Sequence, residues 1–363
     1  MKVALVHDYL REYGGAERVL EELHNIFPNA PLYTAYFNPQ AMGRHGEKFK
    51  DWDIRTSWMQ RIPFANKLIS PFRIFAPLMF EGFDLSEYDL VISSSSAVYF
   101  AKSVITKPGT LHLSYIHTPP RFLYGFATSF NYKKNLITRI GGELINHFLR
   151  LYDFEVSQRP DVLIANSKNV QARIKKFYRR DSVVIYPPVD LSEFKGGQDP
   201  KGDYFLSLNR LVRGKGTEIT VEACTKLNLP LKVAGSGPEL ERLKSIAGKS
   251  VEFLGNVSDQ DRVELLSKAK ALIVASEDED FGITPVESQA AGTPVIAIKA
   301  GGYKETVLEG KTGEFFDQAN VESLVKVLET LDPTKYKAED CKKQAEKFSK
   351  ERFKKETMGL VDA

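Results

Sequence analysis

Short apolar runs recur along the first half of the chain, and most of them end in small or polar residues. These runs are Val3–Val6, Leu90–Ser93, Leu111–Ile116, Val162–Ala165 and Val183–Tyr186. Runs of this length are typical of buried parallel strands, and their polar ends are typical of binding loops at the carboxyl edge of a sheet. Apolar residues at helical spacing follow the first run, between Ala16 and Phe27. The pattern predicts an α/β protein with doubly wound sheets.

A polar stretch at residues 187–201, rich in glycine and proline, interrupts this pattern and is predicted to be a linker. The alternation of strand and helix restarts after it. The second set of apolar runs is Tyr204–Leu208, Leu231–Ala234, Val251–Leu254, Leu272–Val274 and Pro294–Ala297. We therefore expect two Rossmann-like domains, at residues 1–186 and 202–340, with a cleft between them. A helical segment is expected to follow at 341–363.

Composition excludes several classes of function. The chain has 363 residues and a net charge of only +3, which does not favour a nucleic-acid binder. Two cysteines form neither a disulfide framework nor a metal cluster, as is usual in a reducing cytosol. The first residues read as a strand and not as a signal peptide, and no run is long enough for a membrane span. We expect a cytoplasmic protein.

The most informative stretch is SEDEDFGITPVESQAAGTP at residues 276–294, directly after the apolar run Ala271–Ala275. Proline is favoured at a first helical position and glycine just past a helix end. We therefore predict a helix from about Pro285 to Ala291, stopped by Gly292. Glu287 would then lie in its first turn, near unpaired backbone N–H groups.

This stretch combines groups that suit a ligand that is part phosphate and part polyol. Glu279 and Glu287 are separated by seven residues, and Phe281-Gly282 lies between them. Carboxylates accept hydrogen bonds from vicinal hydroxyls, while backbone N–H groups at a helix start hold phosphate oxygens. Two acids at this spacing, taken alone, also fit an acidic loop that is simply solvated.

Three other loops carry candidate chemistry. Gly14-Gly15 lies between the first strand and its helix, which fits either an anion-binding loop or a plain turn. Arg210 and Lys215 lie on a turn before a helix expected to start near Thr217, and such cations either neutralise a diphosphate or face solvent. His117 ends a strand and precedes Thr-Pro-Pro-Arg, which places it better than most histidines to reach a ligand.

Glu279 and Glu287, followed by Ala-Gly-Thr-Pro-Val-Ile, resemble the E-x7-E signature of retaining GT-B glycosyltransferases of family 4. The dipeptide Phe281-Gly282 matches as well, although Asp280 replaces a glycine common in the family. The wording SEDEDFGI is most similar to bacterial mannosyltransferases that build O-antigen-type polysaccharides. In the basic loop, Arg210 and Lys215 are in register with the family pattern, whereas Asn209 replaces its glycine.

The resemblance implies a role for each candidate residue. His117 would lie near the transferred sugar, Arg210 and Lys215 would stabilise the leaving diphosphate, and Glu279 would hold sugar hydroxyls. Glu17 and Arg121 would lie on the acceptor side. The implied donor-binding set is Gly14, Gly15, Asn256, Val257, Phe281, Gly282, Ile283 and Glu287. The final helix would cross back to the first domain, as in other GT-B enzymes.

The reaction implied is transfer of mannose from GDP-mannose to a glycan or lipid-linked acceptor, with retention and without a metal or other cofactor. The cations at Arg210 and Lys215 would do the charge-stabilising work of a metal. Two alternatives remain open at this stage. A GT-B-like sugar-nucleotide epimerase would need no separate acceptor, and a sugar-nucleotide-binding protein would show no turnover.

A basic and aromatic segment runs from Arg44 to Phe80 and contains both tryptophans of the protein. Its cations include Arg55, Arg61, Lys67 and Arg73. Such a mixture predicts either a surface for an anionic membrane or a lipid-linked acceptor, or an ordinary helical core. The sequence does not distinguish between these two interpretations.

Overall fold

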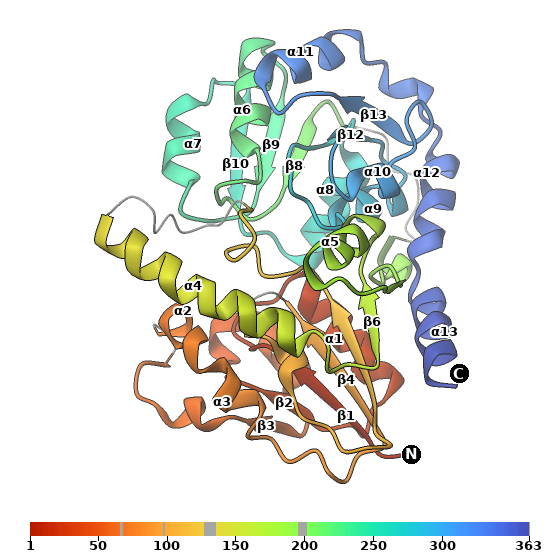
Figure 1. Ribbon diagram of the computed structural model, residues 1–363. Coiled ribbons are helices and arrows are strands. Elements are labelled where there is room, and N and C mark those ends of the chain that lie inside the picture. The colour runs from red at the N-terminus through yellow and green to blue at the C-terminus, as the bar shows by residue number, and fades with distance from the viewer. Residues whose placement is uncertain (66–67, 97–98, 127–135, 195–201, 363) are drawn as a thin grey trace. The chain divides into compact units, whose positions relative to one another are not determined.

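The structure is a computed structural model that describes residues 1–65, 68–96, 99–126, 136–194 and 202–362, with only the backbone for 136–138 (Figure 1). It divides into two compact units. The first contains the described residues up to Pro187 and those from Lys354 onward, and the second contains Pro188–Phe353. Each unit is built on one parallel sheet, which confirms the predicted pair of Rossmann-like domains.

The sheet of the first unit has seven parallel strands in the order β3-β2-β1-β4-β5-β6-β7. Its strands are β1 (Val3–His7), β2 (Leu32–Thr34), β3 (Ile54–Thr56), β4 (Leu90–Ser95), β5 (Leu111–Ile116), β6 (Val162–Ala165) and β7 (Val183–Val184). The chain winds in one direction from β1 to β3 and in the other from β4 to β7. The switch point is therefore between β1 and β4, where loops at the carboxyl ends diverge and ligands bind in such sheets.

The helices of the first unit cover this sheet. They are α1 (Gly15–Ile26), α2 (Ile69–Phe72), α3 (Ala76–Phe80), α4 (Leu136–Val156) and α5 (Lys168–Tyr178). Short 3-10 turns are η1 (Gln40–Phe49), η2 (Trp58–Arg61), η4 (Arg73–Phe75) and η5 (Ala101–Ser103). One core cluster joins Ala4 of β1 and Val91 of β4 to Met79, Phe80 and Leu149 of the helices.

The sheet of the second unit has six parallel strands in the order β10-β9-β8-β11-β12-β13. They are β8 (Phe205–Leu208), β9 (Leu231–Ala234), β10 (Val251–Gly255), β11 (Leu272–Val274), β12 (Val295–Ile298) and β13 (Gly313–Phe316). Here the switch point is between β8 and β11. Residues 209–216 and 275–282, which follow these two strands, are thereby brought side by side.

Two groups of helices flank this second sheet (Figure 1). The helix α6 (Thr217–Lys226) packs against α7 (Leu240–Ile246) and α11 (Val321–Thr330). The helix α9 (Ile283–Ala290) packs against α8 (Asp259–Lys268), α10 (Tyr303–Thr306) and α12 (Ala338–Ala345). The remaining elements are η7 (Leu191–Phe194), η8 (Pro333–Lys335), η9 (Glu346–Phe348) and α13 (Lys350–Val361). In the part of the chain that the structure describes, no helix combines the length and apolar character needed to cross a bilayer.

Most of the predicted strands are confirmed, and the strands that were not predicted have a common cause. The runs at Leu111–Ile116, Leu231–Ala234 and Leu272–Val274 coincide with β5, β9 and β11. The strands β2, β3 and β13 and the helix α4 were not predicted. The first two strands have only three residues each, and β13 begins at a glycine, so their apolar periodicity is too short to recognise.

Candidate functional site

The switch point of the second unit holds a lysine–carboxylate pair. Lys215, just before α6, places Nζ 2.7 Å from Oε2 of Glu279, which follows β11. The two side chains are 28% and 18% exposed, so the pair is accessible from solvent. The Tyr303 hydroxyl approaches the same carboxylate oxygen at 3.4 Å. The structure thus brings together two of the residues predicted to act in the reaction.

A small hollow opens at this pair. Its lining combines an ammonium group, a carboxylate, an amide and the first backbone groups of α9. Polar lining residues include Asn209, Lys215, Glu279, Thr284 and Tyr303. Such a set offers cationic and N–H partners to phosphate oxygens and carboxylate partners to hydroxyls.

The start of α9 differs from the prediction. The helix begins at Ile283, two residues before Pro285, and Gly282 caps it with a left-handed backbone at φ 93°. A side chain at Gly282 would meet the ring of Tyr303 at 3.0 Å, so glycine suits this position on both counts. The N–H groups at this end that lack an intrahelical partner therefore belong to Gly282, Ile283 and Thr284, because Pro285 has no N–H. Glu287 lies beyond that turn, which corrects its predicted place at the helix start.

Glu287 is instead held by an ion pair. Arg262 of α8 donates from Nη1 to Glu287 Oε1 and from Nη2 to Glu193 Oε2 of η7. The Arg262 and Glu287 side chains are only 9% and 5% exposed. A guanidinium that bridges two carboxylates fixes the orientation of both. Arg262 and Glu193 were missed by sequence reasoning, and no local motif marks either residue.

Asn209, where the family pattern has glycine, bridges both ends of the basic loop. Its Nδ2 donates to Ser207 Oγ at 3.1 Å, and its Oδ1 accepts from Thr217 Oγ1 at 3.0 Å. Thr217 is the first residue of α6, as predicted. The amide therefore ties the end of β8 to the start of the helix, and this holds the loop that carries Lys215.

The loop that carries Glu279 is fixed by Gly301-Gly302. The Gly302 N–H donates to the Glu279 carbonyl at 2.9 Å. A Cβ on Gly301 would lie 2.4 Å from that carbonyl oxygen, and one on Gly302 would lie 2.4 Å from Phe281 Cα. Only glycine allows this close backbone approach. The structure thus shows this glycine pair as a support for the Glu279 loop.

The remaining predicted site residues of the second unit lie on three loops. Phe281 is 2% exposed and packs edge-on against Phe348 at 5.3 Å, so its side chain belongs to the core and only its backbone can face a ligand. Asn256, at the end of β10, accepts from Ser236 Oγ at 2.7 Å, and the half-buried Val257 precedes the N-cap Ser258. Arg210 is exposed on the loop that carries Lys215.

The switch point of the first unit holds a chain of buried polar groups. Ser94 Oγ lies 3.0 Å from His7 Nδ1 and 2.9 Å from His117 Nε2. His7 Nε2 is 3.6 Å from Glu17 Oε1, and Glu17 Oε2 accepts from the Gly14 N–H at 2.8 Å. The predicted Gly14, Glu17 and His117 therefore lie in one cluster of polar groups, although the separation of His7 and Glu17 is too long for a hydrogen bond.

His7 and Ser94 complete this cluster but were given no role by the sequence. Each lies at the carboxyl end of its strand, β1 or β4, as His117 does beyond β5. The signal that singled out His117 would have found them. Burial, together with the neighbouring His7, lowers the pKa of His117 to about 3, so His117 is neutral near pH 7. It can orient a hydroxyl but carries no proton to donate as an imidazolium.

Gly15 and Arg121 lie close to this cluster along the chain. Gly15 is the first residue of α1, and Gly14 precedes it as the extended N-cap. Arg121 is half-buried on the turn after β5, where its carbonyl accepts from the Tyr124 and Phe126 N–H groups. Thr118, between His117 and Arg121, accepts from Arg173 Nη1 at 3.1 Å.

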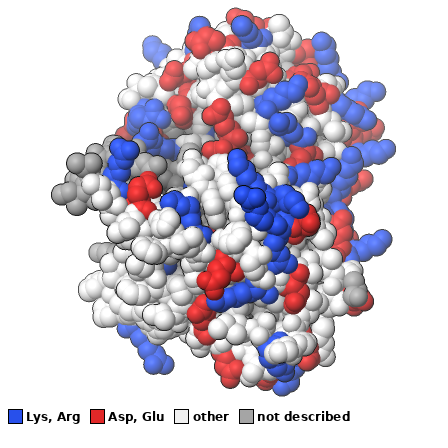
Figure 2. All heavy atoms as spheres, in the orientation of Figure 1, with Lys and Arg blue, Asp and Glu red and all other residues white. Residues whose placement is uncertain are grey.

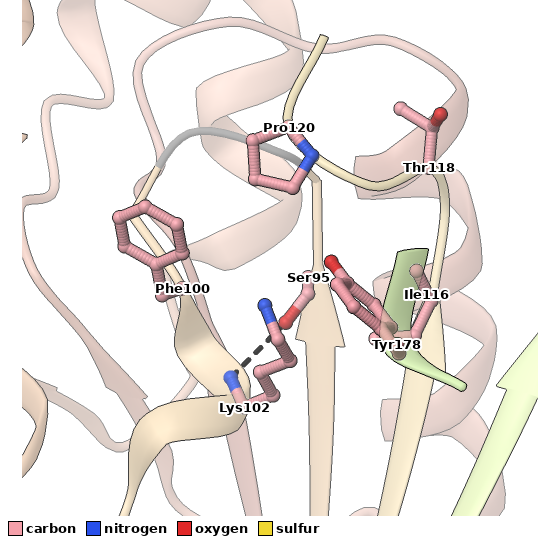
Figure 3. Close-up of a pocket in the computed structure, with 7 residues that line it drawn as sticks. All are labelled: Ser95, Phe100, Lys102, Ile116, Thr118, Pro120 and Tyr178. Atoms are coloured by element: carbon pink, nitrogen blue, oxygen red, sulfur yellow. Dashed lines mark hydrogen bonds between the residues drawn. The ribbon is translucent and has the colours of Figure 1, made fainter. Parts of the chain in front are cut away.

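A second hollow, which lies in the first unit, is lined in part by Lys102 (Figure 3). This lysine belongs to a buried ion pair. Lys102 donates its backbone N–H to Ser95 Oγ at 3.0 Å, and its Nζ lies 2.5 Å from Asp153 Oδ1. The hydroxyls of Tyr124 and Tyr178 donate to Asp153 at 2.8 and 3.3 Å. The charges of Lys102 and Asp153 satisfy each other, so this hollow is structural. Its lining is Ser95, Phe100, Lys102, Ile116, Thr118, Pro120 and Tyr178.

Comparison with known proteins accounts for nearly the whole chain. Residues 13–193 match a family described as Glycosyltransferase Family 4, and residues 189–348 match one described as Glycosyl transferases group 1. An uncharacterised glycosyltransferase of Methanocaldococcus jannaschii is 28% identical over 53% of this chain and 56% of its own length. The chain thus spans little more than half of that relative.

Two further matches extend over more of the chain. The alpha-1,3/1,6-mannosyltransferase ALG2 of Dictyostelium discoideum is 24% identical over 86% of this chain and 85% of its own length. The crystal structure of HepE from Anabaena, in complex with UDP and glucose, covers both chains fully with a TM-score of 0.71 and 18% identity. At that identity the structural match establishes the fold alone.

Proposed function

Because the chain belongs to the family 4 glycosyltransferases with the GT-B fold, we propose that it moves mannose from GDP-mannose to an acceptor hydroxyl, with retention of configuration. The observation that carries this proposal is the accessible pair of Lys215 and Glu279 beside the start of α9. A nucleotide-diphospho-sugar needs cationic groups for its phosphates and carboxylates for its hydroxyls, and this hollow offers both.

In the proposed reaction Lys215 and Arg210 stabilise the negative charge that develops on the leaving diphosphate. The N–H groups at the start of α9 add partial positive charge on the same side of the ligand. Glu279 holds sugar hydroxyls, and its present bond to Lys215 is exchanged for bonds to the donor. Glu287, oriented by Arg262, holds the ribose hydroxyls.

The acceptor hydroxyl attacks the anomeric carbon from the face that the diphosphate leaves. As the bond from sugar to phosphate breaks, a donor phosphate oxygen takes the acceptor's proton, so no covalent glycosyl-enzyme forms. His117 is neutral and positions the transferred sugar. Because two cations do the electrostatic work, we expect EDTA to leave activity intact. Loss of activity that magnesium or manganese restores would contradict this mechanism.

The choice of mannose rests on the motif SEDEDFGI and on the printed activity of the ALG2 relative, an alpha-1,3/1,6-mannosyltransferase. The HepE structure holds UDP and not GDP, so the base must be tested directly. We propose a glycan or lipid-linked acceptor reached from the cytoplasmic face of the membrane.

The test is a panel of GDP-mannose, UDP-glucose and UDP-GlcNAc, each assayed for nucleotide release with and without a polyprenyl-linked glycan acceptor. Acceptor-dependent release of GDP from GDP-mannose supports the proposal. Isomerised donor without nucleotide release would indicate an epimerase. Donor binding without turnover under all conditions would indicate a binding protein.

A further inference from the structure

The helix α4 has two apolar sides, and only one of them is covered by the protein. Leu149 and Val156 are buried on the inner side, where Asp153 pairs with Lys102. At 3.6 residues per turn the opposite side carries a second apolar row. We call this row the outer stripe of α4, and it consists of Ile140, Leu144, Phe148 and Leu151, all exposed.

A helix that is apolar on all sides is normally buried. In the outer stripe Phe148 is 62% exposed, and the other three residues are similarly open to solvent. The stripe extends over about three turns, or roughly 16 Å. Exposed apolar surface of this extent marks a site where another molecule binds.

A second set of exposed apolar residues lies on the elements beside α4. We call it the 58–78 group, and its members are Trp58, Phe64, Leu68, Ile74, Phe75 and Leu78. The rings of Trp58 and Phe75 each contact Phe72, at 6.3 and 5.9 Å, and lie 6.3 Å from each other. These residues therefore form part of one surface.

The two sets are parts of the same face. One core cluster contains Met59, Ile69 and Met79 from the 58–78 elements and Leu149 from α4. The Tyr152 hydroxyl of α4 also donates to Glu81 Oε1, at the end of α3, at 3.1 Å. In Figure 1 the helix α4 is drawn above α2 and α3, and in Figure 2 the corresponding area is mostly uncharged. We call the outer stripe and the 58–78 group together the docking face.

Charge indicates what covers the docking face. The sequence has no aspartate or glutamate from Ile54 to Phe80, although that segment contains four basic residues. Arg61 is exposed next to the 58–78 group, and Arg139 is exposed one residue before the outer stripe. Glu143 is the only acid between Ile140 and Leu151 in the sequence. An apolar surface with cations and few acids complements an anionic bilayer.

The structure changes which cations can contribute. Arg55 is engaged by Asp53 at 2.8 Å and by the Tyr33 hydroxyl at 2.7 Å. Arg73 lies over the ring of Phe122 at 4.6 Å, and burial lowers its pKa. Arg55, which is already paired, and Arg73, which is largely buried, are therefore left out of the surface proposed below, and Lys67 lies outside the described residues. Each interpretation of residues 44–80 holds for part of the segment. Phe49, Met59 and Phe80 belong to the core, whereas the 58–78 group is exposed.

We propose that the docking face binds the surface of a bilayer that contains anionic phospholipids, with α4 lying along the interface. The outer stripe and the 58–78 group enter the boundary between headgroups and acyl chains, where tryptophan and phenylalanine are favoured. Arg61 and Arg139 contact lipid phosphates. This inference goes beyond the proposed transfer reaction, because it depends on no feature of the donor site.

The test is co-sedimentation of the full chain with vesicles of phosphatidylcholine alone or mixed with phosphatidylglycerol. The main variant is L144Q/F148Q/L151Q, whose positions are exposed and whose new residues favour helix. The matched control is I105Q/L308Q, which removes exposed apolar side chains outside the docking face. A third variant, R61Q/R139Q, removes the two exposed cations. Thermal melting of each variant checks the fold.

We expect the wild type and the control to bind the anionic vesicles, and binding to weaken as salt rises. The main variant should bind at least about tenfold more weakly while melting like the wild type. The third variant should lose about fivefold for each arginine removed. A wild type that ignores both vesicles, or a main variant that binds like the control, would overturn the proposal.

Two further outcomes would also overturn it. Equal binding to both vesicle types would remove the role of charge. A concentration-dependent dimer, seen by light scattering in the wild type and absent from the main variant, would assign the face to a second copy of the chain. If the main variant does not fold, the single changes L144Q and F148Q repeat the test. Because binding is measured without any donor, failure here is distinct from failure of the proposed reaction.

Discussion

The two units each contain a lysine–carboxylate pair, and the pairs differ in their surroundings more than in their geometry. Lys215 and Glu279 are 2.7 Å apart, with side chains 28% and 18% exposed. Lys102 and Asp153 are 2.5 Å apart, with side chains 2% and 0% exposed. Both members of the first pair line a hollow at a sheet switch point, whereas only the lysine of the second pair lines a hollow.

The neighbours of each pair explain the difference. Asp153 accepts from two tyrosine hydroxyls, and the Lys102 ammonium lies 5.2 Å from the rings of both Phe100 and Tyr178. These groups satisfy the charges and exclude water. Glu279 has the more distant Tyr303 hydroxyl, at 3.4 Å, and faces the hollow at the start of α9. A charged pair indicates a ligand site when its surroundings leave room and further polar partners for a ligand.

The largest effect should be a loss of stability when the buried pair of Lys102 and Asp153 is broken. Replacing Asp153 by Asn leaves the Lys102 ammonium buried without a carboxylate, which typically costs about 3–5 kcal/mol of stability. Urea unfolding measures the loss. The matched control is Asp181→Asn, which breaks the 2.7 Å pair with Lys175 on the surface and should leave the midpoint unchanged. The neutral double variant K102Q/D153N should recover part of the loss. Equal midpoints for D153N and D181N would contradict this account.

Breaking the accessible pair of Lys215 and Glu279 should instead reduce activity and leave stability nearly unchanged. Lys215→Ala is expected to raise the barrier to sugar transfer by about 2–4 kcal/mol, because the leaving diphosphate loses a stabilising charge. Its urea midpoint should stay close to that of the wild type. Initial rates with saturating donor measure the effect, and the exposed Lys249→Ala is the control. Transfer at the wild-type rate would remove Lys215 from the site.

Two buried histidines of the first unit, which are neutral near pH 7, should make its stability depend on pH. Burial lowers the pKa of His117 to about 3 and of His112 to about 4, both below the ordinary value of 6.5. The folded state therefore binds fewer protons than the unfolded state in this range. Stability is complete above pH 6.5 and is lost as the pH falls toward the folded values. We expect each histidine to remove about 2 kcal/mol by about pH 5.

Urea unfolding at a series of pH values measures this slope. The variant H117Q should remove the contribution of His117 to the pH dependence of stability and leave that of His112. A slope that is unchanged in H117Q would show that His117 is protonated equally in both states.

The smallest effect on catalysis is expected at Arg262, whose buried pair with Glu287 belongs to the candidate site. Arg262→Gln should raise the KM for the donor by roughly tenfold, or about 1.4 kcal/mol, with little change in kcat, because Glu287 is no longer oriented. Arg262→Lys keeps the charge, and its KM should lie between those of the wild type and Arg262→Gln. A lower melting temperature with an unchanged KM would make Arg262 purely structural.

The sequence by itself determined the local elements and the chemical groups that each loop carries. The apolar runs at Leu111–Ile116 and Leu231–Ala234 are continuous and short, so they could only be buried strands or brief helical pieces. The acids near Gly282, and Lys215 before Thr217, were recognisable because they occur within a few residues of each other. Such signals depend only on residues that are close together in the sequence, so they can be recognised without the tertiary structure.

Only the tertiary structure decided which of these groups meet. Lys215 and Glu279 are 64 residues apart and are joined because β8 pairs with β11. Arg262 reaches Glu287 because α8 packs against α9. The outer stripe of α4 has the composition of a buried helix, and its exposure follows from the absence of any described element over it. Strand order and helix packing arise from the whole chain, so no local pattern contains them.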